Sequence, residues 1–284
     1  MNLNLASNMI KILCPLSILK NGITISQLGI TTTSKKVFNN SIDNGINFFD
    51  MKVPHKIYPY SNKIFLYTKL ELYKPLTLTT LFNQKKINTY TIENTINKLY
   101  QENIDVIFID GYNMNTSNLN TSNLNISIII DKIKKDKNIN TIGLIVDNIQ
   151  TAQFLLENTN IDLLLLTKFN IFEMEDYINL FNIAQKNNID IIIENKYNMN
   201  LFNLIPYTIY NNFNDNTIKK RDLLHILYQN NISTETFLMQ YPLQYKNVKS
   251  IIVDCKNENS THIIDNFNNI VPLHVWKNID SILF

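Results

Sequence analysis

The most constraining feature of this sequence is a set of three short apolar runs between residues 141 and 193. TIGLIV (141–146), IDLLLL (161–166) and IDIII (189–193) are nearly continuous in hydrophobic residues and have the length of β-strands. A strand with one face in water would alternate apolar and polar residues, so these runs predict strands that are buried on both faces. Burial on both faces is typical of a parallel sheet covered by helices.

The segments between these runs have the spacing of amphipathic helices. Ala152, Leu155 and Leu156 would share one helix face in the first segment, as Leu180 and Ala184 would in the second. Parallel strands need crossovers of about a dozen residues, and both segments are long enough to supply one. The middle of the chain is therefore predicted to be a βαβαβ unit.

Five further strands are predicted outside this unit. They are LGITT (28–32), INFFD (46–50), NKIFLYTKL (62–70), IDVIFID (104–110) and SIIVD (250–254). Eight strands, each followed by a helical segment, in a chain of 284 residues predict a (β/α)8 TIM barrel. Residues 1–27 are predicted to be an extended lead-in, and residues 28–284 a single barrel domain.

Composition narrows the classes of partner and the compartment. The net charge of +2 offers no electrostatic case for binding nucleic acid or an acidic membrane. No apolar run approaches the ~18 residues of a membrane span. The two cysteines fit a reducing compartment, so a cytoplasmic location is expected, and no His/Cys spacing predicts a metal site. We expect a monomer or a weak homo-oligomer that acts on a small molecule.

The barrel itself predicts where functional groups lie. In this fold the active site is built at the carboxyl ends of the strands. That rule nominates residues at or shortly after the ends of the predicted strands: Asp50, Lys69, Asp110, Asp147, Lys168 with its neighbour Phe169, Asn195 with Tyr197, and Asp254 with Lys256.

Several stretches also resemble one enzyme family, the aldo-keto reductases. NGINFFD resembles the family's second-strand segment with its catalytic Asp, and IFLYTKL its third-strand segment with the catalytic Lys. IGLIVDN, DLLLLTKFNIFEMEDYINLFNIAQKNNIDIIIENKYNMNLF and ETFLMQYPLQYKNVKSIIVDCKNENS follow its fifth to eighth strands. These later segments are most similar to the aldose 1-dehydrogenase branch, which includes D-threo-aldose (L-fucose) and pyridoxal dehydrogenases.

The resemblance implies oxidation of an aldose, or reduction of a small aldehyde, with NADP or NAD as the hydride carrier. Asp50 and Lys69 stand at the family's catalytic Asp and Lys. The family's proton-transferring Tyr is replaced by His55, with Tyr58 close behind, and its His is replaced by Asp110. In the family, the Lys cation lowers the pKa of the Tyr hydroxyl, which is otherwise near 10.

The same resemblance implies a set of cofactor-binding residues: Asp147, Phe169, Tyr197 and Lys256. Phe169 matches the aromatic residue that stacks on nicotinamide, with packing in the core as the alternative. Lys256 matches an Arg that meets the adenosine phosphate. Two functions stay open at this point. One is a divergent aldo-keto reductase, and the other is a catalytically silent barrel that was retained to bind a ligand or a partner.

Overall fold

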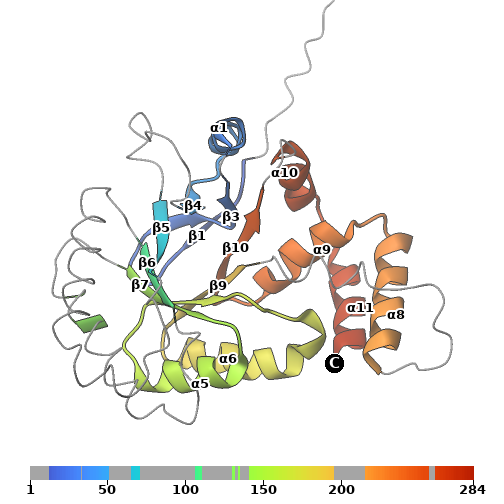
Figure 1. Cartoon of the computed structure of the whole chain (residues 1–284). Coiled ribbons are helices and arrows are strands. Elements are labelled where there is room, and N and C mark those ends of the chain that lie inside the picture. Colours follow the sequence, from blue (N-terminus) through green and yellow to red (C-terminus); the bar gives the residue numbers. More distant parts are fainter. Residues whose placement is uncertain are drawn as a thin grey trace, which may run out of the picture.

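Eight parallel strands pair in a closed ring in this computed structural model of the chain (Figure 1). The structure describes residues 13–32, 34–50, 65–70, 106–110, 130–131, 134, 141–194, 215–255 and 260–284. Within these ranges only the backbone is described for residues 50, 65–70, 110, 215–217 and 260.

The ring follows the order of the chain. Its strands are β3 (Leu28–Thr31), β4 (Phe48–Asp50), β5 (Phe65–Leu70), β6 (Val106–Asp110), β7 (Thr141–Val146), β8 (Leu163–Leu166), β9 (Asp190–Glu194) and β10 (Val248–Asp254). Each strand pairs with the next, and β10 pairs back onto β3, where Ile251 lies opposite Leu28 and Asp254 opposite Thr31. All eight predicted strands are confirmed, and so is the (β/α)8 barrel.

Helices cover the outside of the ring. The described ones are α1 (Lys35–Asp43), α5 (Ile149–Asn158), α6 (Met174–Lys186), α8 (Asp215–Gln229), α9 (Thr234–Gln240), α10 (Ser260–Asn268) and α11 (Leu273–Leu283), with 3-10 turns η2 (Ile171–Glu173) and η3 (Tyr241–Gln244). In Figure 1, α5 and α6 lie side by side beneath the strands, and they contact one another. Ser34 caps the start of α1, because its side chain accepts a hydrogen bond from the Val37 N–H.

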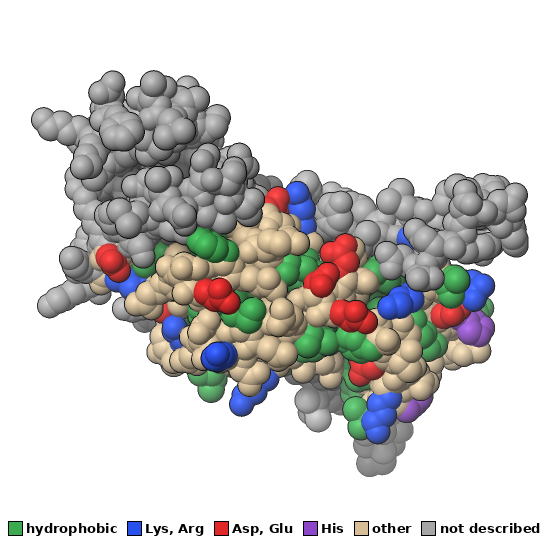
Figure 2. Space-filling model, turned by 90° about the horizontal axis from the view of Figure 1, so that it is seen from below, with side chains coloured by type: hydrophobic (Ala, Val, Ile, Leu, Met, Phe, Trp, Pro, Cys, Tyr) green, Lys and Arg blue, Asp and Glu red, His purple; other side chains and the backbone are tan. Residues whose placement is uncertain are grey.

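The outer surface has the mixed character of solvated helix faces. Figure 2 shows acidic and basic side chains interspersed on one face of the molecule, with hydrophobic side chains in small groups between them. The apolar faces of the helices point inward instead. Leu155 of α5 and Leu180 of α6, for example, are fully buried in one cluster with Leu164 of β8.

A separate hydrophobic cluster fills the interior of the ring. It draws residues from six strands, which only the inside of a barrel can bring together: Phe48, Val106, Phe108, Ile145, Leu163, Leu165, Ile192 and Ile252. The alternation of a strand is visible in β8, because Leu163 and Leu165 belong to this interior cluster while Leu164 and Leu166 pack under the helices.

Two glycines make room for the aromatic rings of the interior. Gly143 of β7 lies opposite Phe108 of β6, and a Cβ at Gly143 would overlap the Phe108 ring. A Cβ at Gly29 of β3 would lie 2.9 Å from Cδ1 of Phe48. Each glycine therefore leaves the space that a neighbouring Phe fills, and the barrel interior stays close-packed.

A β-hairpin, which was not predicted within the lead-in, closes the amino end of the barrel. Its strands β1 (Leu16–Ile18) and β2 (Thr24–Ser26) are antiparallel, and Gly22 in the turn between them has φ +85°. Leu19 and Ile25 of the hairpin are buried in the interior cluster. The hairpin thus plugs the ring from the end opposite the carboxyl ends of the strands.

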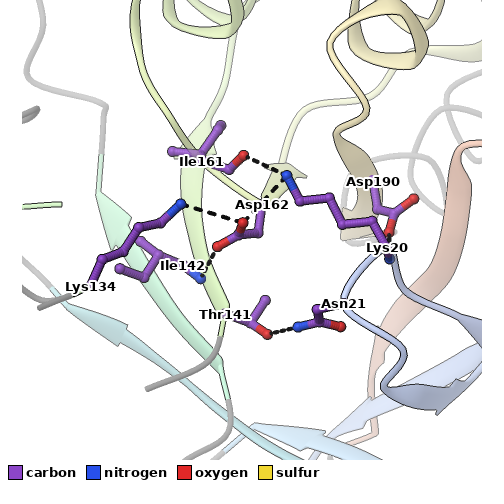
Figure 3. Close-up of polar contacts among 8 residues, drawn as sticks. All are labelled: Lys20, Asn21, Lys134, Thr141, Ile142, Ile161, Asp162 and Asp190. Atoms are coloured by element: carbon purple, nitrogen blue, oxygen red, sulfur yellow. Dashed lines mark hydrogen bonds and ion pairs between the residues drawn. The ribbon is translucent and has the colours of Figure 1, made fainter. Parts of the chain in front are cut away.

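Polar contacts fix this plug to the strands above it (Figure 3). The Lys20 backbone N–H donates to the Asp190 carboxylate at 2.7 Å, and the Lys20 ammonium lies 3.3 Å from the Asp162 carboxylate. Asp162 also pairs with Lys134 at 3.4 Å. The Asn21 side chain donates to the Thr141 hydroxyl. Because all these groups lie at the amino end of the barrel, we assign them to stability.

We predict that Gly143→Ala destabilises the barrel. The new methyl group must displace the Phe108 ring inside a filled interior, and overpacking of this kind costs about 1–3 kcal/mol. Urea unfolding monitored by circular dichroism measures the loss. The double variant Gly143→Ala/Phe108→Leu is the matched test, because the smaller Leu makes room. A double variant less stable than the sum of its two single changes would contradict this account.

We predict that Asp190 makes the stability depend on pH. Burial raises the pKa of its carboxyl above the ordinary value of 3.8, against the opposing effects of the Lys20 N–H and the Lys249 and Lys20 charges. The folded chain therefore holds this proton more tightly than the unfolded chain. Its contribution to stability is present below pH 3.8 and is lost as pH rises through the raised pKa.

Asp190→Asn removes this titration and keeps an oxygen that accepts the Lys20 N–H. Melting temperatures between pH 3.5 and 7 should show the wild type losing stability relative to the variant as pH rises. Parallel curves for the two proteins would rule out this role of the carboxyl.

Candidate active site

The carboxyl ends of the strands bring several of the nominated residues to one mouth of the barrel. Asp50 ends β4, Lys69 is the penultimate residue of β5, and Asp110 ends β6. Asp147 directly follows β7. His55, Tyr58, Tyr197 and Lys256, also nominated from the sequence, lie outside the described residues.

The register of β4 and β5 places Asp50 near Lys69 along the backbone. Asp50 lies opposite Tyr67, so Lys69 is two residues further toward the carboxyl end of the neighbouring strand. With strands ~4.8 Å apart and ~3.3 Å per residue, this offset corresponds to a Cα separation of about 8 Å. Lys69 in turn lies opposite Phe108, whose side chain is inside the barrel. The backbone thus brings the carboxylate and the ammonium positions to adjacent strand ends.

On the β7 and β8 side of the mouth, Asp147 and Lys168 form an ion pair. The Lys168 ammonium lies 2.9 Å from Oδ2 of Asp147, and the two side chains are 54% and 23% exposed. Oδ1 of Asp147 accepts a hydrogen bond from the Asn148 amide at 3.2 Å. Asn148 is itself fixed, because it caps α5 by accepting from the Thr151 N–H at 2.7 Å. The carboxylate is therefore held at the rim from two sides and is still accessible to solvent.

The segment after β8 is anchored through its backbone. The Thr167 N–H donates to the Val146 carbonyl at 3.0 Å, and the Tyr177 hydroxyl of α6 donates to the Lys168 carbonyl at 3.0 Å. Burial raises the pKa of Tyr177 to about 12, so the hydroxyl keeps the proton that this hydrogen bond needs. Asn170 then accepts from the Phe172 N–H and starts η2. This loop is short and rigidly tied, which suits a binding rim.

Phe169 lies in the helix-covered core. Its side chain is fully buried, and its ring centroid lies 4.7 Å from that of Tyr177 and 6.4 Å from that of Phe181. Both partners belong to α6, so Phe169 is part of the packing between the barrel and this helix. Stacking on a nicotinamide would require the ring to leave this cluster. Of the predicted cofactor-binding residues that the structure describes, Asp147 is partly exposed and Phe169 is covered.

A buried carboxylate at the mouth was not nominated from the sequence. Glu194 ends β9, is 4% exposed, and lies opposite Ile252 of β10. Ile192, two residues earlier, is in the interior cluster, so the alternation of the strand turns Glu194 inward as well. The strand-end rule that nominated Asp50 and Asp110 would have found Glu194 if the predicted strand had been extended by one residue.

The described residues contain neither a cluster of metal-binding side chains nor a membrane-spanning helix. In that part of the chain, no group of three or more His, Cys, Asp or Glu side chains is arranged to hold a metal ion. The helices described there also include none that is long and apolar enough to cross a membrane.

Comparisons with known proteins agree with this geometry at the level of the fold. An aldo-keto reductase from Bacillus halodurans in its holo form matches with a TM-score of 0.68 and 11% identity, covering 95% of this chain and 96% of its own. One from a Medee basin deep-sea metagenome library gives a TM-score of 0.61 and 16% identity, with 94% of each chain covered. One from the silkworm Bombyx mori gives 0.60 and 13%, covering 96% of this chain and 88% of its own.

The chain therefore has the TIM-barrel fold of the aldo-keto reductases over nearly its whole length. Sequence comparison alone does not assign the chain to that family, because no family model and no curated protein matches it. At 11–16% identity the structural likeness defines the fold, and the activity has to be argued from the residues of this chain.

We predict that Phe169 contributes mainly to stability. Removing its fully buried ring in Phe169→Ala should lower the free energy of unfolding by about 3–5 kcal/mol. Phe172→Ala is the matched control, because Phe172 is only partly buried, and its effect should be smaller. Urea denaturation of both variants measures the difference. Equal losses would show that Phe169 is not the better packed of the two.

Proposed function

We propose that this chain is a divergent aldo-keto reductase that oxidises an aldose, or reduces a small aldehyde, with NADP or NAD. The observation that carries the proposal is the placement of Asp50 and Lys69 at adjacent strand ends of a barrel with the aldo-keto reductase fold. The carboxyl ends of the strands are where such barrels bind their substrates.

The proposed roles follow from charge. Lys69 stabilises negative charge on the substrate oxygen as its proton leaves or arrives, and Asp50 holds the Lys69 ammonium. His55, Tyr58 and Asp110 are the candidates for proton transfer, since each can exchange a proton with a substrate hydroxyl.

The nicotinamide, when bound, supplies the hydride chemistry. Asp147, Tyr197 and Lys256 are the proposed cofactor contacts, with Phe169 contributing only if its ring is released from the core.

The burial of Phe169 favours a second candidate, a catalytically silent barrel that binds a ligand or a partner. In this alternative the aromatic residue expected to stack on nicotinamide has become a packing residue. The two candidates differ in cofactor binding. Calorimetric titration with NADP+ and NAD+ separates them, and absence of binding of either at millimolar concentration would reject the enzyme.

The reducing compartment expected from the cysteines is part of this proposal. Cys14 and Cys255 are both buried and are not joined in a disulfide, and burial raises the pKa of the Cys14 thiol to about 11. Neither is placed for easy oxidation, since the thiolate is the reactive form. We propose a cytoplasmic enzyme on this ground.

We predict that Lys69→Met abolishes aldose oxidation while the fold is retained. Loss of one group that stabilises charge or moves a proton typically lowers the rate by about 10²–10⁴-fold. NAD(P)H formation followed at 340 nm with a panel of aldoses measures this. Lys186→Met, an exposed lysine of α6, is the matched control and should leave turnover unchanged. Unchanged turnover in Lys69→Met would place the chemistry elsewhere.

A further inference from the structure

The Asp147–Lys168 ion pair has a geometry that stability alone does not explain. It is half exposed, and exposed ion pairs contribute little to the free energy of folding. Yet the backbone that carries Lys168 is tied down by Thr167 on one side and by the Tyr177 hydroxyl on the other. Phe169, the next residue, is locked between the barrel and α6. The flexible side chain of Lys168 is therefore attached to a backbone segment that is held in place on both sides.

This arrangement presents a positive charge at a defined point of the mouth. Asp147 holds the ammonium at 2.9 Å, so its position is set before any ligand arrives. A ligand that carries an anionic oxygen group can take the place of Asp147 at small cost, because the ion pair itself is weak. The Lys168 side chain is 54% exposed and can be reached from solvent.

A second carboxylate at the mouth, that of Glu194, lies deeper than Asp147. Leu166 is opposite Ile193 across β8 and β9, so Glu194 is level with Thr167 and one residue below Lys168. Glu194 is 4% exposed, whereas Lys168 reaches solvent. A ligand that approaches the rim therefore meets the lysine first.

We propose that Lys168 recognises a phosphate or carboxylate group on the substrate, with Tyr177 as its positioning residue and Asp147 as the internal carboxylate that the ligand displaces. This inference rests on the proposed function and narrows it, since the substrate becomes an anionic aldose or aldehyde. The same chemistry also exists in the diphosphate of a dinucleotide, so the experiment separates the two sources.

The test compares two sugars that differ only in a phosphate. D-ribose 5-phosphate and D-ribose are titrated into the whole protein by calorimetry. We expect the phosphate to tighten binding by about 10- to 100-fold, the range for a hydrogen bond to a charged group. Lys168→Met should bring the two affinities to within about twofold of each other, and Lys168→Arg should restore most of the difference.

Variants of Asp147 and Tyr177 should change the preference for the phosphorylated sugar in opposite directions. Asp147→Asn removes the internal competitor for the ammonium and should increase the preference for the phosphorylated sugar, whereas loss of a merely structural pair would not. Tyr177→Phe removes only the hydroxyl that holds the Lys168 carbonyl and should reduce the preference several-fold. Lys186→Met on the same helix is the control, and circular dichroism verifies that each variant is folded.

Three results would overturn the inference. They are equal or absent binding of the two sugars by the wild type, a preference that survives Lys168→Met, and a Lys168→Met effect confined to NADPH titrations. The last result would show that Lys168 binds the cofactor and not the substrate. Failure of the wild type to bind NADPH or NADP+ would instead reject the proposed function, and the sugar comparison would still decide the role of Lys168.

Discussion

The structure depends on the pairing that joins the last strand of the barrel to the first. Ile251 to Asp254 of β10 lie opposite Leu28 to Thr31 of β3. Further hydrogen bonds continue the seam at both ends, from the Ile251 N–H to the Gln27 carbonyl and from the Cys255 N–H to the Thr31 carbonyl. Closure leaves the sheet with no free edge. It also directs all eight carboxyl ends to one mouth, so that residues from distant parts of the chain share a site.

Much of this fold could be predicted because buried parallel strands leave a strong mark in sequence. TIGLIV became β7 with every residue buried, and the four leucines of IDLLLL became β8. The β1–β2 hairpin left no such mark. Its strands are three residues long, and in β1 both Leu16 and Ile18 are exposed, so neither periodicity nor a continuous apolar run identified them. The turn-forming pair Asn21-Gly22 is the local sequence signal for it.

The candidate site was predictable to the extent that it depends on strand ends. The positions of Asp50, Lys69, Asp110 and Asp147 at the mouth could be predicted because the strands that carry or precede them are recognisable in the sequence. The ring of Phe169 shows the limit of that reasoning. Its position after β8 was predictable, but whether its ring faces the mouth or α6 is decided by packing against Tyr177 and Phe181 of that helix, which the pattern of the strand does not reveal. Glu194 was missed for a smaller reason, a strand boundary placed one residue early.

The hairpin at the amino end has a consequence for the order in which the molecule assembles. Lys20 is synthesised 170 residues before its partner Asp190. Thr32 likewise donates to the Cys255 carbonyl, 223 positions downstream. Contacts of such long sequence separation form slowly, because a large loop must close before they give any stabilisation. The hairpin therefore lacks the carboxylate that binds it until the segment with Asp190 has been synthesised, and the hairpin and the closed ring are completed together.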